Sequence, residues 1–524
     1  MPDRPDLADR LRAPEAYPHA VVTPIRVVET HISLVLLTGT YAYKIKKPVR
    51  LSFLDYSTLA KRLACCEEEL RLNRRYAPDL YLGVSTVGGP ATAPRIDSGG
   101  EPIEYAVRMR QFDRHDELGE LLATRGVDAA ELAALGEHVA RFHSSAAPVV
   151  ATSTFGTAGA VRKIILDNFA SLRSLPEAAQ WQETVQALEQ WVELTHGRLQ
   201  TLIGRRRDSG LVRECHGDLH CGNVVRWKGA LTPFDGIEFD PALRFIDVAN
   251  DIAFLTMDLA MHDRHDLRRA VLQAWTQTLG DFGGLPLLPY FETYRALVRA
   301  KVAALRALQE QSGSRERSME CGAATRYLAW ANGRARRPPP CLVLTCGLSG
   351  SGKTSLARAV AVPLRALHVR SDVERKRLAG LGPLDDSRSP LDGGIYSRDF
   401  TQRTYARLQD CAASALQGGE SVIVDAAFLK RDERRDMLGL AQRMAVPFAI
   451  LHCAAPLAVL RERLESRSRS GSDSSEAGVA ILARQPGYWE DFDDEERAKV
   501  VAVDTTAPDA AAGALDELRA LGVG

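Results

Sequence analysis

Gly347-Leu-Ser-Gly-Ser-Gly-Lys-Thr354 is the stretch that decides the fold of the C-terminal part of this chain. It matches the phosphate-binding pattern G-x-x-x-x-G-K-[ST] at every fixed position. The apolar run Cys341–Cys346 comes directly before it, and the helix-forming run Ser355–Ala361 follows it. Because a strand, a glycine-rich turn and a helix are the context that the pattern requires, we expect a parallel α/β domain of the P-loop type.

The residues of this loop are predicted to bind a nucleoside triphosphate. Glycines let the backbone amides curl around phosphate oxygens, the Lys353 ammonium should reach the β- and γ-phosphates, and the Thr354 hydroxyl should bind Mg²⁺. ATP and Mg²⁺ are therefore the expected cofactors. The predicted ATP-binding residues are Gly347, Ser349, Gly350, Ser351, Gly352, Lys353, Thr354 and Ser355.

Two later strand-like runs each end in an aspartate. Ser421–Asp425 ends in Asp425, the expected second group at Mg²⁺, and Leu367–Asp372 ends in Asp372. Carboxyl ends of parallel strands line the ligand crevice, so Asp372 can face an acceptor hydroxyl and act as its base. An N-cap of the following helix is the alternative role for Asp372.

Arginines cluster before a serine-rich stretch, Ser466–Ser475, which is predicted to be a mobile loop. Phosphoryl transfer needs positive charge on the migrating group, so Arg463 and Arg467 are expected to support the site as part of a lid. A solvated helix face is the alternative. The full cluster is Arg461, Arg463, Arg467 and Arg469.

The motif GLSGSGKTS, Asp372 and the run VIVDAAF together resemble the small-molecule P-loop kinases of the gluconate-kinase and zeta-toxin-like AAA group. The resemblance covers residues 340 to about 505. Members of that group phosphorylate hydroxyls of small molecules, and some relatives act on polynucleotide ends. The resemblance therefore implies a kinase and says little about its acceptor.

The basic, proline-rich stretch from Gly333 to Pro340 is the clearest boundary in the chain, because consecutive prolines cannot continue a helix. We predict one domain over residues 1–338 and a P-loop domain over 339–524 that folds alone. Strand-like runs and one charged helix, Thr58–Tyr76, fill residues 20–112, whereas mostly helical patterns fill 113–335. The strand-like runs are Ile32–Thr38, Ala42–Ile45 and Glu104–Phe112.

His216-Gly-Asp218-Leu-His-Cys-Gly-Asn223 has the spacing of the kinase catalytic loop H-R-D-x-x-x-x-N, with glycine in the middle position. Phe234-Asp235-Gly236 follows one hairpin later. Asp218 is predicted to accept or orient the acceptor hydroxyl, while Asn223 and Asp235 hold Mg²⁺ against the phosphates.

A zinc cluster is the alternative for the same stretch. Its ligands would be crowded into one short segment, which differs from the usual split spacing of zinc sites. The four candidate ligands are Cys215, His216, His220 and Cys221.

The runs HGDLHCGN and FDGIEFD and the acidic helix Asp247–Asp251 resemble the aminoglycoside and choline phosphotransferase superfamily, over residues 25 to about 310. The resemblance implies a bilobal, protein-kinase-like fold. It also implies that Asp218 is the base, that Asn223 and Asp235 bind the metal, and that His216 supports the loop.

The small lobe of such a fold should supply a lysine to the α- and β-phosphates. Lys44 is favoured, although Lys46 lies on the same side of the predicted strand and stays an alternative. The ion-pair partner is expected on the helix Thr58–Tyr76, at Glu69 or otherwise at its neighbours Glu67 and Glu68.

The amino-acid composition argues against several classes of protein. Lys plus Arg equals Asp plus Glu, 67 against 67, whereas a general nucleic-acid coat shows a basic excess. There is no apolar run long enough for a membrane span or a signal peptide. The nine cysteines lack a CxxC pair, which favours free thiols in a reducing cytoplasm.

The sequence therefore predicts a cytoplasmic, multidomain, bifunctional phosphotransferase that moves the γ-phosphoryl of ATP to hydroxyls of small polar molecules such as sugars or aminoglycosides. No membrane partner is expected, and a nucleic-acid partner is disfavoured. One alternative is a regulatory or toxin-neutralising protein with one site that binds nucleotide without transfer. Another is a nucleic-acid end kinase in the C-terminal half.

Overall fold

The computed structural model describes residues 4–30, 32–51, 54–90, 92–336, 339–390, 393–470, 474–476 and 478–523. The chain forms two compact units. Unit 1 comprises Met1–Asp263 and Tyr294–Tyr327, and unit 2 comprises Arg264–Thr293 and Leu328–Gly524. Residues 264–293 of the predicted first domain thus belong to the unit that contains the P-loop. Whether 1–338 and 339–524 fold separately stays a prediction, and residues 337 and 338 of the proposed linker lie outside the described residues.

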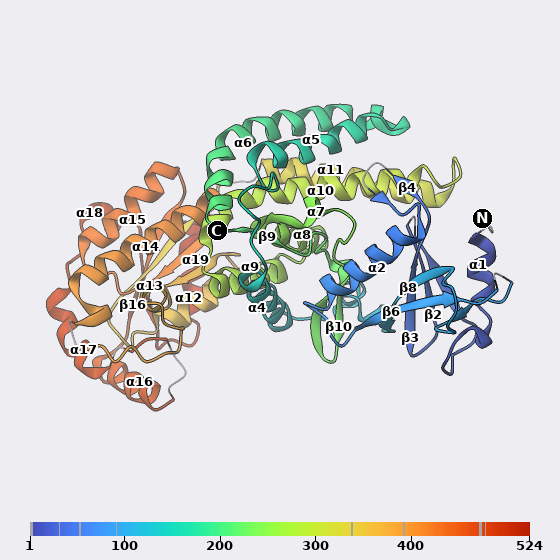
Figure 1. Cartoon of the computed structure of the whole chain (residues 1–524). Helices are drawn as coiled ribbons and strands as arrows, with labels where there is room; N and C mark the ends of the chain where they lie inside the picture. Colours follow the sequence, from blue (N-terminus) through green and yellow to red (C-terminus); the bar gives the residue numbers. More distant parts are fainter. Residues whose placement is uncertain are drawn as a thin grey trace. The chain divides into compact units, whose positions relative to one another are not determined.

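The small lobe of unit 1 is a six-stranded antiparallel sheet with one long helix against it (Figure 1). Helix α2 (Leu59–Asn73) packs on β6 and β8, and the Thr58 hydroxyl caps its first turn by accepting from the amide of Lys61 at 3.3 Å. The predicted strands and the predicted helix are confirmed within a few residues. In sheet order the strands are β1 (Arg26–Glu29), β2 (Ser33–Leu37), β3 (Tyr41–Lys46), β8 (Glu104–Arg110), β6 (Tyr81–Gly88) and β7 (Arg95–Ile96).

The large lobe of unit 1 is mainly helical, as predicted. Its central helix α8 (Val248–Met261) is buried along almost its whole length, which matches its nearly continuous apolar sequence. Two short strand pairs carry the catalytic-loop segment: β9 (Val212–Glu214) with β12 (Phe245–Asp247), and β10 (Val224–Trp227) with β11 (Ala230–Pro233). The other main helices are α4 (Ala129–Ser145), α5 (Ala158–Arg173) and α6 (Gln182–Asp208). Helix α10 (Leu288–Ala307) begins in unit 2, and helix α11 (Arg315–Ala335) ends in it.

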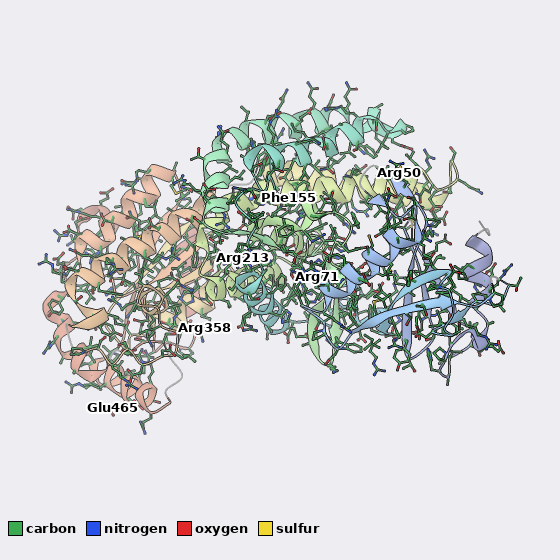
Figure 2. All side chains as sticks on the ribbon, in the orientation of Figure 1. Arg50, Arg71, Phe155, Arg213, Arg358 and Glu465 are labelled. Atoms are coloured by element: carbon green, nitrogen blue, oxygen red, sulfur yellow. The ribbon has the colours of Figure 1, made fainter. Side chains whose placement is uncertain are left out.

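The two lobes of unit 1 are joined by charged contacts beside the catalytic loop. Arg71 of α2, labelled in Figure 2, donates to Glu214 of β9 at 2.6 Å and to Glu68 at 2.7 Å. Arg244 donates to the same two carboxylates, at 3.2 Å and 2.7 Å. This network fixes α2 against the segment that carries Asp218.

Unit 2 contains the predicted parallel sheet. Its order is β14-β15-β13-β16-β17, and β13 to β16 are apolar runs because both sheet faces are covered. Helices α12 (Lys353–Ala361) and α19 (Ala510–Ala520) share one apolar core with the sheet, while α14 (Arg398–Gln417) packs on β14 and β15. The strands are β13 (Leu342–Cys346), β14 (Leu367–Arg370), β15 (Val422–Asp425), β16 (Phe448–Ala454) and β17 (Val500–Asp504).

A buried charge network ties the separate segments of unit 2 together. Arg268 of α9 (His265–Leu279) donates to Glu420 at 2.7 and 2.9 Å and to Glu292 at 2.9 Å. Arg334 of α11 donates to Glu420 at 3.3 Å and also pairs with Glu292. The four side chains are nearly inaccessible and their charges balance, so each depends on the others.

One prediction about local structure and one alternative are wrong. Ser466–Ser470 is not a loop, because α16 (Leu457–Ser470) continues through these residues, and Gly471–Asp473 lie outside the described residues. Asp372 is not an N-cap: it lies inside α13 (Ser371–Leu378), whose capping residue is Arg370. No helix in the described ranges is both long and apolar enough to cross a membrane.

Candidate functional site

The P-loop of unit 2 is shaped by glycines in a left-handed backbone conformation that other residues rarely adopt. Gly350 and Gly352 have φ of +81° and +83°, and a Cβ on Gly350 would lie 2.7 Å from the carbonyl oxygen of Leu460. Lys353 folds over the same loop and donates to the carbonyl oxygens of Gly347 at 2.8 Å and Leu348 at 2.7 Å. Burial lowers the pKa of the Lys353 ammonium. The lysine is therefore positioned by backbone that the motif itself supplies.

A cavity of about 660 Å³ opens over this loop, a size suited to a nucleotide. Gly347 does not line the cavity, and Ser351 is fully buried behind it, where its hydroxyl has no hydrogen-bond partner among the described residues. The other predicted residues of this half all line it: Ser349, Gly350, Gly352, Lys353, Thr354, Ser355, Asp372, Asp425, Arg463 and Arg467.

Asp425 lies at the end of β15, nearly buried. The Thr345 hydroxyl donates to it at 3.1 Å, and His368 Nε2 lies 3.1 Å from its other oxygen. Burial alone would raise the pKa of Asp425, but His368, Thr354 and Lys353 outweigh it and lower that pKa to about 2. An ionised carboxylate beside the Thr354 hydroxyl is the hard-oxygen donor set that suits Mg²⁺.

Other residues around this cavity were not found from the sequence. Gln485 accepts from the amide of Ser349 at 2.6 Å, so its side chain takes one of the loop amides expected to bind phosphate. Thr505 accepts from Arg463 at 3.0 Å and donates to the carbonyl of Ser351 at 2.8 Å. Neither residue belongs to a motif, and only the folded chain brings them to the loop.

A second cavity of unit 2, about 1010 Å³, adjoins the first. Arg375, Tyr396, Tyr405 and Gln485 line both. Arg375 is nearly buried and donates to the carbonyl of Ile395 at 2.7 Å. Asp372 lines the first cavity one helical turn before Arg375, so a molecule in the second cavity would lie near that carboxylate.

The lysine site of unit 1 is built from side chains far apart in the sequence. Lys44 Nζ lies 2.9 Å from Glu69 Oε1 and also pairs with Asp235. Lys46 pairs with the other oxygen of Glu69 and with Glu238. The predicted pair of Lys44 with Glu69 is present, and the contact with Asp235 favours Lys44 as the lysine that faces the site.

Glu69 is completely buried between the two lysines. Burial alone would raise the pKa of Glu69, but the two ammonium groups lower it to about 2. The neighbouring glutamates are not the ion-pair partner of Lys44, because Glu67 is exposed and Glu68 pairs with Arg71 and Arg244.

The catalytic loop brings Asp218 and Asn223 together. Asn223 Nδ2 donates to the Asp218 carboxylate at 3.0 Å and to its carbonyl at 2.9 Å, which leaves Oδ1 of Asn223 for a metal ion. Burial alone would raise the pKa of Asp218, yet His220, His216 and Arg299 hold it well below its usual value. Asp218 is therefore ionised at neutral pH, the state that the predicted role as a base requires.

Asp235 is held in a left-handed backbone conformation with φ of +61°. Its amide donates to the Tyr81 hydroxyl at 3.0 Å, and the amide of Gly236 donates to Asn73 at 2.8 Å. These bonds to the small lobe fix the turn that presents the carboxylate. Asp235 and Asn223 offer hard oxygen atoms, which fits a magnesium ion.

Buried residues of the large lobe brace the loop, and the catalytic-loop motif did not reveal them. Asp251 of α8 accepts from the amides of His216 at 3.1 Å and Gly217 at 2.8 Å, and His143 Nε2 lies 3.0 Å from it. Arg295 donates to the carbonyl of Gly217 at 2.9 Å. Gly217 has φ of +85°, and a Cβ there would lie 2.8 Å from the carbonyl of Leu243, which explains the glycine in the middle position.

The zinc alternative finds no support in the part of the chain that the structure describes. Cys215 gathers with His143 and Asp251, whereas Cys221 gathers with Asp258 and His262. His216 and His220 belong to neither group. The four proposed ligands thus do not converge on one ion.

Parts of the chain are similar to known proteins. Residues 342–490 match the family described as AAA domain. An adenylyl-sulfate kinase of Myxococcus xanthus is 32% identical over 118 residues, 22% of this chain and 59% of that protein. A choline/ethanolamine kinase family protein of Mesorhizobium loti covers 63% of this chain and 99% of its own, with 14% identity and a TM-score of 0.38.

One relative spans almost the whole chain. It is the Mycobacterium tuberculosis protein named "Uncharacterized protein Rv2004c", which is 32% identical over 477 residues, 91% of this chain and 93% of that protein. An alignment of that length includes most of each of the two units. The chain therefore belongs to the same family as Rv2004c.

Proposed function

We propose that the chain is a bifunctional ATP-dependent phosphotransferase, in which each unit moves the γ-phosphoryl of ATP to a hydroxyl of a small polar molecule. The observation that carries the proposal is that each unit gathers a lysine, an aspartate suited to act as a base and hard-oxygen ligands. The two sets are Lys353, Asp372, Thr354 and Asp425 in unit 2, and Lys44, Asp218, Asn223 and Asp235 in unit 1.

In unit 2, Lys353 and the loop amides would hold the phosphates, and Thr354 and Asp425 would hold Mg²⁺. Magnesium there would neutralise charge on the phosphates. Asp372 would orient the acceptor hydroxyl and accept its proton. Arg463 and Arg467, which line the cavity, would add positive charge near the transferring group. The match to the AAA domain family and the likeness to an adenylyl-sulfate kinase support this half of the proposal.

In unit 1, Lys44 would hold the phosphates while Glu69 keeps its ammonium in place. Asn223 and Asp235 would bind the metal, and Asp218 would take the proton of the acceptor hydroxyl. His216 supports the loop, because its Nε2 lies 2.9 Å from the carbonyl of Phe234, next to Asp235. Both the base and the metal ligand thus have a side chain or backbone contact that fixes their position.

A second candidate for unit 2 is a kinase of nucleic-acid ends. Tyr396, Tyr405 and Tyr488 line the 1010 Å³ cavity together with Arg375, Arg398 and Lys430, and aromatic and basic groups suit a nucleotide. Acidic residues of the same wall oppose it, because they would repel a polyphosphate strand. They are Asp432, Glu433, Asp436 and Glu476.

The test is a metabolite-extract screen with γ-labelled ATP on the full chain. Wild type should label two sets of products, one lost with Asp218→Asn and the other with Lys353→Ala. Asp167→Asn and Lys163→Ala, an exposed pair on α5, serve as matched controls that should lose neither. A double variant Asp218→Asn/Lys353→Ala that labels as wild type does would reject the proposal. Labelling of an oligonucleotide end, lost with Lys353→Ala, would establish the second candidate.

A further inference from the structure

Unit 1 contains a cavity of about 400 Å³ to which the proposed function assigns no role. Side chains from α8, α10 and α11 line it, and its polar wall is strongly basic. Arg299, Arg306, Arg326 and His262 line the cavity together with one carboxylate, Glu320. A cavity of this size holds a small metabolite or a large part of one.

Arg299 connects this cavity with the catalytic loop. Its Nη1 lies 3.4 Å from His220 Nε2, and the same His220 atom lies 3.5 Å from Asp218 Oδ2. Its Nε donates to the Tyr327 hydroxyl at 3.2 Å, and Tyr327 also lines the cavity. A single imidazole therefore separates the proposed base from the basic wall.

The positive charge of the wall is only partly balanced within the protein. Buried Asp258 attracts Arg299 and also accepts from the amide of Cys221 at 2.9 Å. Arg306 and Arg326 are exposed, and their guanidinium groups form no ion pair or hydrogen bond with any residue in the described ranges. With Glu320 as their one acidic neighbour in the wall, a net positive charge remains for a ligand.

We propose that this cavity binds an anionic group of the acceptor, so that the Asp218 site phosphorylates a hydroxyl compound that also carries a phosphate or carboxylate. The inference rests on the proposed function of unit 1 and names its substrate class. Guanidinium groups pair with both anions through two parallel hydrogen bonds, which would also orient the acceptor.

The step that follows is a direct transfer. The acceptor hydroxyl oxygen forms a bond to the γ-phosphorus of ATP, the bond from that phosphorus to the bridging oxygen of ADP breaks, and the hydroxyl proton passes to Asp218. A cationic or neutral acceptor would leave the arginines without a partner. Anionic acceptors are thus expected to be preferred over aminoglycoside-like or neutral ones.

The binding test uses calorimetric titration of the full chain with inorganic phosphate and, separately, with acetate, in the presence of saturating Mg²⁺ and a non-hydrolysable ATP analogue. Arg306→Gln/Arg326→Gln should weaken binding of the preferred anion about tenfold or more, which corresponds to about 1.4 kcal/mol. Arg141→Gln/Arg198→Gln, which removes two exposed arginines from α4 and α6, is the matched control and should bind as wild type does. Equal binding in the two double variants would overturn the proposal.

The transfer test compares sugar phosphates, sugar acids and neutral sugars as acceptors that depend on Asp218. The cavity variant should raise the KM for the anionic acceptor about tenfold and leave kcat and the KM for ATP unchanged. A neutral sugar as the best acceptor would overturn the inference. Anion binding lost in the cavity variant, with no transfer that depends on Asp218, would keep the anion site but reject the proposed function and the acceptor assignment together.

Discussion

The two candidate sites hold their lysines in different ways. Lys353 is fixed by carbonyl oxygens only five and six residues before it, so the P-loop site is largely local in sequence. Lys44 is fixed by Glu69 and by Asp235, which lies 191 residues away. Backbone geometry therefore positions the first lysine, whereas side-chain charge and the packing of two lobes position the second.

The aspartates of the two sites, Asp425 and Asp218, are also held in place in different ways. Asp425 ends a strand of a continuous sheet and is bonded by Thr345 and His368 from neighbouring strands. Asp218 lies in a loop that Asp251 and Arg295 brace from helices of the large lobe. The unit 1 site should consequently be more sensitive to substitutions distant from the bound nucleotide.

Loss of the unit 1 base should have the largest effect. Asp218→Asn keeps the side-chain shape and the contact with Asn223 but removes the carboxylate that is proposed to accept the hydroxyl proton. Transfer by unit 1 should fall about 10²–10⁴-fold while Mg²⁺-ATP binding survives. Initial rates in a Lys353→Ala background and calorimetric titration with Mg²⁺-ATP measure the two quantities.

The variant Asp235→Asn distinguishes the proposed metal ligand from the proposed base at the same site. A hard cation would lose an anionic oxygen ligand, so Mg²⁺-ATP binding by unit 1 should weaken. Asp167→Asn on α5 is the control for charge alone. The assigned roles would be wrong if Asp218→Asn abolished nucleotide binding and Asp235→Asn changed neither binding nor transfer.

The second prediction concerns the buried network of unit 2. Glu420→Ala leaves the guanidinium groups of Arg268 and Arg334 buried with one carboxylate, Glu292, so unfolding free energy of this unit should fall by about 3–5 kcal/mol. Urea unfolding measures it. Glu517→Ala, an exposed glutamate on α19, should change it by less than about 0.5 kcal/mol.

The same network tests where the chain can be divided. A fragment of residues 340–524 lacks Arg268, Glu292 and Arg334, and it should be less stable than the full unit. Limited proteolysis near residue 338 that released a stable, ATP-binding fragment would instead favour the predicted boundary.

Lys353→Ala is expected to have a smaller effect than the loss of the unit 1 base. The substitution removes a charge that is proposed to contact the transferring group but leaves the glycine loop, so transfer by unit 2 should fall about a hundredfold. Initial rates in an Asp218→Asn background measure it, with Lys163→Ala as the control. Wild-type turnover would show that Lys353 does not contact the transferring phosphoryl group.

Sequence reasoning found the local site more completely than the assembled one. The P-loop, Thr354 and Asp425 follow from contiguous patterns whose geometry is set by strand and helix. Lys44 and Glu69 were also predicted, since a strand and a charged helix carried them. His368, Gln485, Asp258 and Arg295 were not, because only tertiary packing brings them to the loops that they contact. Residues 264–293 cluster with the P-loop unit, although the sequence placed them in the first domain, because their contacts are with residues far later in the chain, such as Glu420 for Arg268 and His368 for Gln273. The boundary near residue 338 itself stays a prediction.

The smallest effect expected concerns Asp251, the buried brace of the unit 1 loop. Burial alone would raise the pKa of Asp251, but His143, His216 and the Gly217 amide lower it from 3.8 to about 2. A depressed folded-state pKa means that the unfolded chain takes up the proton first as pH falls. The stability from this carboxylate is therefore fully present above about pH 4 and is lost as the pH falls toward 2.

The Asp251→Asn variant tests this account directly. At pH 7 it should lower the unfolding free energy of unit 1 by about 2 kcal/mol, since a shift of about two units is worth that amount. The difference from wild type should shrink between pH 4 and pH 2.5, because wild type then loses the same charge. Urea unfolding at pH 7, 5, 4 and 2.5 measures it, with Asp167→Asn as the exposed control. A difference that stayed constant across this range would mean that Asp251 braces the loop by shape and hydrogen bonding alone. Ionisation would then contribute nothing to the rigidity of the site that holds Asp218.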